Sequence, residues 1–186
     1  MLKVAVIGDT DVGKSSLVSR FVYRNKIPKV EHTVGVDVTV TSLFVHNKVH
    51  RVKFFDLTGS YFYESLYDTY LLNAEAIIVV YDTTRLKTFV KAKLFVKKII
   101  DIHSDNYPII LVGNKIDQIP KRRVELSQAL TFVKKLSSTY YIETSAKNDI
   151  NTKDCLRLLI AEASRNQKDI VQIKEEDVSE SGCGIV

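Results

Sequence analysis

The residues best suited to chemistry begin at Gly8, where the chain reads Gly-Asp-Thr-Asp-Val-Gly-Lys-Ser as far as Ser15. This run fits the pattern G-x-x-x-x-G-K-[ST], and it lies between the apolar run Val4–Ile7 and the amphipathic segment Ser15–Tyr23. Such a loop binds phosphate oxygens with its backbone N–H groups and the N-terminus of the helix that follows. Its lysine reaches the β- and γ-phosphates, and its hydroxyl ligates Mg²⁺. We therefore predict a phosphate and Mg²⁺ site built from Gly8, Asp11, Val12, Gly13, Lys14, Ser15 and Ser16.

A second motif, Asn114-Lys-Ile-Asp117, follows the apolar run Ile109–Val112. A carboxylate in the plane of a purine accepts two hydrogen bonds from guanine, whereas adenine offers neither in that arrangement. Asp117 is therefore predicted to select guanine, with Asn114 and the stem of Lys115 supporting the pocket from the side. The segment Ser145-Ala146-Lys147 is expected to offer a backbone N–H to the guanine oxygen.

The segment Asp56-Leu-Thr-Gly59 is expected to sense the third phosphate. Asp56 can hold a water bound to Mg²⁺, and the N–H of Gly59 can reach the γ-phosphate. The hydroxyl of Thr33 is placed to complete the Mg²⁺ coordination only when the third phosphate is present. The expected ligand is therefore a guanine nucleoside triphosphate with Mg²⁺.

These motifs need a scaffold, and the apolar patterning predicts one. Short apolar runs typical of buried parallel strands occur at Val4–Ile7, Val52–Phe55, Ile77–Tyr81, Ile109–Val112 and Tyr140–Ile142. Amphipathic segments typical of helices alternate with them at Ser15–Tyr23, Thr88–Ile102, Ser127–Leu136 and Thr152–Ser164. Alternation of this kind predicts an α/β domain with helices on both faces of a mostly parallel, six-stranded sheet. The segment Val34–Val45 should form a hairpin with the second run, which makes one edge strand antiparallel.

The composition favours one globular domain, residues 1–165, followed by a flexible tail, residues 166–186. The net charge of +5 resides largely in Lys91, Lys93, Lys97 and Lys98 and in Lys121–Arg123, which we interpret as a solvated helix face and a solvated loop. Because basic residues are not interleaved with aromatic ones, nucleic-acid binding is not predicted. The two cysteines, Cys155 and Cys183, match no metal or disulfide framework, which fits a reducing compartment.

The chain as a whole resembles the small GTPases of the Ras superfamily, and most of all the Rab family, of which it would be a divergent member. The Rab-like features are Thr33-Val-Gly-Val-Asp37, the spacing from Thr33 to Asp56, and Tyr81-Asp-Thr-Thr84. The resemblance implies a G domain that binds GTP or GDP with Mg²⁺ and acts as a switch in vesicle traffic. It also implies a monomer whose partners are an exchange factor, a GTPase-activating protein, effectors, and a prenyl-binding escort or dissociation inhibitor.

Two departures from the family concern hydrolysis. The glutamine that orients the attacking water is replaced by Ser60, whose hydroxyl is too short to span the same distance. Thr10 and Asp11 occupy loop positions where relatives usually have small residues. Since intrinsic rates in this superfamily are on the order of 10⁻⁴ s⁻¹, we expect still slower hydrolysis, with Lys14, Gly59 and Ser60 as the catalytic groups. Both a slow switch and a GTP-locked binding scaffold stay open, while an ATPase or small-molecule kinase is disfavoured by Asn114–Asp117.

A third departure concerns the surface that binds effectors. The aromatic triad of Rab relatives corresponds to Val38, Phe55 and Tyr70. The smaller Val38 should change the shape of that surface. Phe55 and Tyr70 could equally serve as ordinary packing between the sheet and the segment after Asp56.

The chain ends in Cys183-Gly-Ile-Val186, which has the form of a prenylation motif. The alternative is a free cysteine in a flexible tail. The neighbouring Glu175, Glu176, Asp177 and Glu180 would be repelled by an anionic leaflet. We therefore expect weak or protein-assisted residence on the cytoplasmic face of an endomembrane or the plasma membrane. Cys155 is expected to be a core residue.

Overall fold

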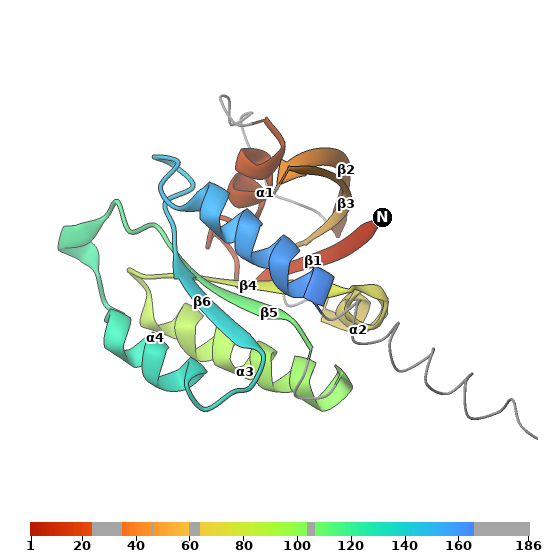
Figure 1. Ribbon diagram of the computed structural model, residues 1–186. Coiled ribbons are helices and arrows are strands. Elements are labelled where there is room, and N and C mark those ends of the chain that lie inside the picture. Colours follow the sequence, from red (N-terminus) through yellow and green to blue (C-terminus); the bar gives the residue numbers. More distant parts are fainter. Residues whose placement is uncertain (24–34, 46, 60–63, 104–106, 166–186) are drawn as a thin grey trace, which may run out of the picture.

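The computed structural model describes residues 1–23, 35–45, 47–59, 64–103 and 107–165 (Figure 1). Thr33, Ser60, Cys183 and the predicted tail lie outside the described residues. The strands are β1 (Leu2–Gly8), β2 (Val36–Val45), β3 (Lys48–Leu57), β4 (Ala76–Asp82), β5 (Ile109–Asn114) and β6 (Thr139–Glu143). The helices are α1 (Lys14–Tyr23), α2 (Glu64–Asn73), α3 (Leu86–His103), the short 3-10 helix η2 (Ile119–Lys121), α4 (Leu126–Val133) and a last helix over residues 152–165.

The six strands form a single sheet in the order β2-β3-β1-β4-β5-β6. β2 pairs with β3 in the antiparallel direction, and each of the other neighbouring pairs is parallel. The predicted fold class, including the antiparallel edge strand, is therefore confirmed.

Helices cover both faces of the sheet because apolar residues continue along the central strands without interruption. In β1, Val4 and Val6 pack toward α1 and the last helix. Ala5 and Ile7 point to the other face and pack toward α2, α3 and α4. A strand that buries both of its faces has to be apolar at every position, which is why its pattern does not alternate.

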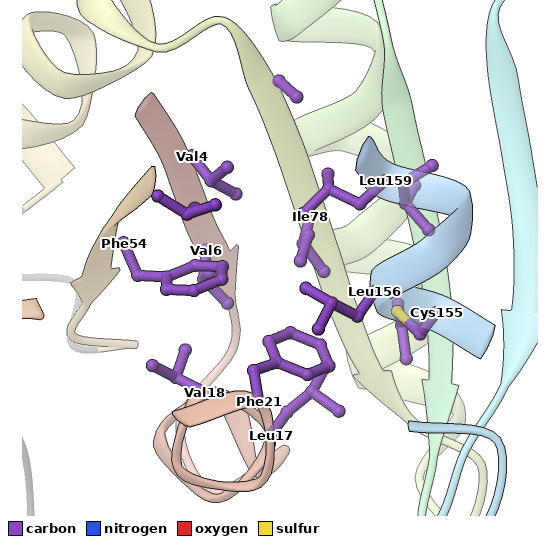
Figure 2. Close-up of a cluster of buried hydrophobic side chains, with 14 of the residues drawn as sticks. Val4, Val6, Leu17, Val18, Phe21, Phe54, Ile78, Cys155, Leu156 and Leu159 are labelled. Atoms are coloured by element: carbon purple, nitrogen blue, oxygen red, sulfur yellow. The ribbon is translucent and has the colours of Figure 1, made fainter. Parts of the chain in front are cut away.

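Cys155 lies in the cluster between the sheet, α1 and the last helix (Figure 2). Its side chain is fully buried, and this burial raises the pKa of the thiol to about 12. Figure 2 shows it beside Leu156, on the side of the helix that faces Ile78. The prediction that Cys155 is a core residue is confirmed.

The topology brings the motif loops together. The chain runs from β1 to β3 on one side of β1 and later from β3 to β4 on the other side. In open α/β sheets, ligands bind outside the carboxyl ends of the strands where the winding changes direction. The ends of the parallel strands meet at this edge, at Gly8, Leu57, Asp82, Asn114 and Glu143.

Some bounds differ from the prediction. α2 and η2 were not predicted, α3 begins at Leu86 rather than Thr88, and α4 ends at Val133 rather than Leu136. Among the described residues, no helix combines the length and apolar character that crossing a membrane would need.

Candidate nucleotide-binding site

The loop after β1 is held by its carbonyl groups. The ammonium group of Lys14 donates to the carbonyl oxygens of Gly8 at 3.2 Å and Asp9 at 2.8 Å. The Gly13 carbonyl accepts the N–H of Leu17 at 3.0 Å as α1 begins. The intervening carbonyls accept from side chains of later loops: Thr10 from Arg85 at 2.8 Å, Asp11 from Lys115 at 2.5 Å and Val12 from Asn114 at 2.9 Å. Protein contacts thus fix the carbonyl side of the loop, as expected where the N–H side faces a phosphate.

Two glycines allow the close approaches that this arrangement requires. Gly13 has a φ of 96°, and a Cβ there would clash with the side-chain amide of Asn114. A Cβ on Gly59 would clash with the backbone of Asp9 and Thr10. Gly59 therefore lies directly against the phosphate loop, beside the position expected for a third phosphate.

Asp11 adopts a left-handed conformation, with a φ of 59°. Aspartate tolerates this region better than most residues, although glycine adopts it at lower cost. The residue is exposed. The backbone of the loop thus accommodates aspartate at this position, and the side chain of Asp11 lies at the surface of the loop.

A charged pair is buried where the loop meets β3. Lys14 is 6% exposed and Asp56 is 3% exposed. Burial lowers the pKa of Lys14 to about 8, with the negative charge of Asp56 acting in the opposite direction. Burial likewise raises the pKa of Asp56 to about 6, opposed by a hydrogen bond from Ser15 and by the charge of Lys14. Desolvation outweighs the attraction between the two groups in both cases.

Asp56 and Ser15 fit a Mg²⁺ ion. The Oδ1 atom of Asp56 is buried and accepts no hydrogen bond from the described residues. A buried carboxylate oxygen beside a hydroxyl is the kind of donor set that a hard cation prefers. The described residues contain no cluster of three or more His, Cys, Asp or Glu side chains that could hold a metal. Mg²⁺ usually binds one or two carboxylates together with substrate phosphates.

The loops after β5 and β6 are joined by side-chain hydrogen bonds. The Oδ1 atom of Asn114 accepts from the Thr144 hydroxyl at 3.2 Å and from the Ala146 N–H at 3.1 Å. Asp117 accepts a hydrogen bond from the Ser145 hydroxyl at 2.6 Å. That hydroxyl in turn accepts the N–H of Asn148 at 3.0 Å. The orientation of the Asp117 carboxylate is therefore set by the protein itself.

The structure brings most of the predicted site residues to one edge of the sheet. Hydrogen bonds connect the phosphate loop to Asn114 and Lys115. Asn114 also accepts from Thr144 and Ala146, and Asp117 accepts from Ser145. The carbonyls of Ala146 and Lys147 each accept from the Arg20 guanidinium at 2.7 Å, which ties α1 to the same loop. Val12 is buried and Ser16 is half-buried in the first turn of α1.

Sequence reasoning did not find Asp82 and Arg85 as members of this site. The Oδ2 atom of Asp82 is 2.9 Å from the Lys115 ammonium and 3.1 Å from Nε of Arg85. Although burial acts to raise it, the pKa of Asp82 is lowered by hydrogen bonds from Thr84 and Lys115. Asp82 thus orients the two cations that hold the carbonyls of Thr10 and Asp11. In the sequence, the motif that contains Asp82, Tyr81–Thr84, indicated only the family resemblance.

Arg122 also differs from the prediction. The Lys121–Arg123 segment was interpreted as a solvated loop, and Lys121 and Arg123 are indeed exposed. Arg122 instead donates to both carboxylate oxygens of Glu143, at 2.9 and 2.7 Å. The Tyr141 hydroxyl donates to the same carboxylate at 2.9 Å and lies 2.8 Å from the Tyr81 hydroxyl. This network fixes the end of β6, from which the loop with Ser145 begins.

The three predicted effector residues are neighbours in the structure. Val38 is exposed on β2, directly across from Phe55 on β3. The rings of Phe55 and Tyr70 are 5.1 Å apart, and Phe55 is buried. Packing between the sheet and α2 is therefore observed for Phe55 and Tyr70. An additional role in binding effectors is compatible with this packing.

Together, the phosphate loop and the α/β fold with its parallel strand ends at one edge define a phosphate-loop nucleotide-binding domain. Comparison with known proteins specifies the family. Residues 3–165 match the Ras family. The chain is 35% identical over 162 residues to the Ras-related protein RABC1 of Arabidopsis thaliana, covering 86% of this chain and 76% of that protein. It is 32% identical over 162 residues to the Ras-related protein Rab11B of Nicotiana tabacum, covering 87% of this chain and 74% of that protein. The chain therefore belongs to the Ras family of small GTPases, and it is Rab-like.

Proposed function

We propose that the chain binds GTP and GDP with Mg²⁺ and acts as a Rab-type switch in membrane traffic with slow intrinsic hydrolysis. The observation that carries the proposal is the phosphate loop, whose carbonyls are held by Lys14, Arg85, Lys115 and Asn114. A loop held in this way needs little reorganisation to present its N–H groups to phosphates. The oriented Asp117 carboxylate supports guanine as the base.

The chain's own residues would divide the work of binding. Lys14 would exchange the carbonyls of Gly8 and Asp9 for phosphate oxygens, and the N–H of Gly59 would donate to the third phosphate. Ser15 would ligate Mg²⁺ directly, and Asp56 would hold it through a water. The ion, when bound, neutralises phosphate charge. Thr33 lies outside the described residues. Its hydroxyl would complete the Mg²⁺ coordination when the third phosphate is present.

The slow hydrolysis rests on residues around Gly59. Ser60 lacks the reach of the usual glutamine, so the attacking water would be poorly oriented. Thr10 and Asp11 are both exposed in the phosphate loop, and the backbone of Thr10 lies against Gly59. Their side chains would crowd the approach to the third phosphate. The same observation favours a second candidate, a protein that holds GTP almost permanently and acts as a binding scaffold.

Single-turnover hydrolysis of bound GTP, with and without cell extract, separates these two functions. Under the switch proposal, hydrolysis is slow alone and is accelerated by an activating protein in the extract. Absence of turnover in both conditions would rule out the switch and favour the scaffold. A Ser60→Gln variant should hydrolyse GTP faster than the unchanged chain, with Ser60→Ala as the matched control. Equal rates for all three chains would show that Ser60 does not limit hydrolysis.

The membrane part of the proposal rests on Cys183 and on the family. Prenylation of this cysteine would give weak attachment, assisted by an escort protein, because one lipid chain binds a membrane reversibly. An exchange factor, an activating protein and effectors are the partners expected of a Rab-like protein. Mass spectrometry of the chain purified from a eukaryotic host tests the lipid directly. An unmodified C-terminus that still contains the last three residues would contradict this part.

A further inference from the structure

α3 exposes an apolar stripe that the nucleotide site does not use. Leu86, Val90 and Leu94 are 49%, 47% and 62% exposed. Their spacing of four residues places them in a row along one side of the helix. The opposite side of α3 is buried against the sheet through Phe89, Phe95 and Val96. The helix is therefore apolar on two sides, of which the core covers only one.

α4 continues this surface. It lies beside α3 on the same face of the sheet (Figure 1). Between the helices lies a groove of about 270 Å³ lined by Leu86, Phe89, Lys93, Gln128, Phe132 and Lys135. The rings of Phe89 and Phe132 are 6.5 Å apart, edge to face, so aromatic side chains from both helices contribute to the groove.

Lysines surround the apolar groups. Lys87 and Lys97 on α3 and Lys134 and Lys135, directly after α4, are exposed, and Lys93 lines the groove. Exposed acidic residues on these two helices and at their caps are limited, within the described ranges, to Asp101 and Glu125. Other cations of α3 have acidic partners elsewhere, since Lys91 contacts Asp9 and Lys98 contacts Asp68. The α3–α4 surface, defined as these exposed residues and the groove, is thus both apolar and positively charged.

We propose that the α3–α4 surface binds an amphipathic helix of another protein whose apolar face is flanked by acidic residues. Apolar anchors of such a helix would enter the groove, and its carboxylates would face the lysines. A second copy of this chain is disfavoured because it would bring the same positive charge to the contact. A flat lipid surface would leave the groove between the helices unfilled.

The proposed contact is separate from the nucleotide site. The surface contains neither the phosphate loop nor Asp56 nor the effector residues Val38, Phe55 and Tyr70. Binding should therefore be equally strong with GDP and with a non-hydrolysable GTP analogue. This property distinguishes the α3–α4 surface from the segments expected to sense the third phosphate, and the test of the proposal does not depend on the proposed slow hydrolysis.

The test uses the full chain and a labelled 18-residue peptide in which leucines follow the helical period and glutamates occupy the other positions. Fluorescence anisotropy should show saturable binding that weakens with salt. A Lys93→Glu/Lys97→Glu double variant should bind at least about tenfold more weakly, as should Leu94→Ser. Lys48→Glu and Val49→Ser, exposed on the β2–β3 hairpin, are the matched controls and should bind normally.

Four results would overturn the proposal. The first is no binding of the acidic peptide. The second is equal binding of a peptide with lysine in place of glutamate. The third is binding of phosphatidylserine vesicles, but not of the peptide, through Lys93 and Lys97, which would assign the surface to lipid. The fourth is tighter peptide binding after Glu175, Glu176 and Asp177 are all changed to Gln, which would assign it to the chain's own tail.

Discussion

The two ends of the nucleotide site differ in how completely the protein satisfies their polar groups. At the base side, defined by Asn114, Lys115, Asp117 and Ser145, the side chains hydrogen-bond or ion-pair with one another and with neighbouring loops. At the metal side, defined by Lys14, Ser15 and Asp56, a carboxylate oxygen is buried without a hydrogen bond from the described residues. There, burial dominates the pKa of both charged groups.

This difference indicates which half of the site depends on its ligand. The base side is organised by the protein and should keep its shape without nucleotide. The metal side holds charges whose desolvation is not fully compensated, and a Mg²⁺ ion with phosphates would compensate it. Loss of metal or nucleotide should therefore change the structure around Asp56 first and the structure around Asn114 only later.

The largest effect is expected for Lys14→Ala, which removes the cation at the metal side. The chain should lose at least about 1,000-fold in affinity for both GDP and GTP, because a buried charge contact with phosphate contributes several kcal/mol. Calorimetric titration measures this loss. Lys91→Ala, which removes a nearby cation that ion-pairs with Asp9, is the matched control and should change affinity much less. Comparable losses in the two variants would mean that Lys14 has no special role.

The next effect concerns the base side. Asp117→Ala should weaken GTP binding by about 100-fold, since hydrogen bonds to a charged group contribute about 1.5–3 kcal/mol each. ATP affinity should change little, so the preference for guanine should largely disappear. Competition between GTP and ATP for a labelled nucleotide measures the preference. Unchanged GTP affinity would refute the assigned role of Asp117.

A third effect follows from the buried carboxylate. The pKa of Asp56 is raised from 3.8 to about 6 in the folded chain, so the folded state binds more protons than the unfolded state between these values. The free energy of unfolding of the ligand-free chain should therefore fall as the pH rises through about 6. Asp56→Asn should remove this dependence and stabilise the ligand-free chain at pH 7 by up to about 3 kcal/mol, while weakening Mg²⁺-dependent nucleotide binding.

Urea denaturation of both chains at pH 5 and pH 7.5, without nucleotide or Mg²⁺, checks this prediction. The difference in stability between the variant and the unchanged chain should be larger at the higher pH. A difference that does not depend on pH would mean that Asp56 is not destabilised by burial. The contrast between the two sides of the site would then be lost.

The smallest effect is expected for Arg122→Ala. This change leaves the Glu143 carboxylate with Tyr141 as its remaining side-chain donor among the described residues. We expect a loss of about 1–3 kcal/mol in stability and a reduction of only a few-fold in GTP affinity. Thermal unfolding and nucleotide titration measure the two quantities. Arg123→Ala, one residue further along and exposed, should change neither, and equal effects of the two changes would contradict the anchoring role of Arg122.

Local patterns were sufficient for the scaffold and for the motif residues. The uninterrupted apolar runs predicted the buried strands, and the phosphate loop and Asn114–Asp117 were visible as short motifs in the right positions. α2 was missed because Leu71 is fully buried while the adjacent Leu72 is exposed, so no single apolar stripe marks the helix.

The supporting contacts could not be predicted because they join distant parts of the chain. Arg85 reaches Thr10 across 75 residues, and Arg122 reaches Glu143 across 21. In sequence, both arginines look like ordinary surface charges. Their roles depend on the parallel pairing that places the ends of β4, β5 and β6 side by side.

Binding of a guanine nucleotide with Mg²⁺ is the property from which the proposed switch follows. The nucleotide released on denaturing the purified full-length chain, identified by chromatography and quantified against protein, tests it most directly. We expect GDP or GTP in close to equimolar amount, retained in Mg²⁺ and lost on chelation, with a large share of GTP if turnover is slow. An adenine nucleotide, or a chain that binds no guanine nucleotide when GTP and Mg²⁺ are added, would contradict it.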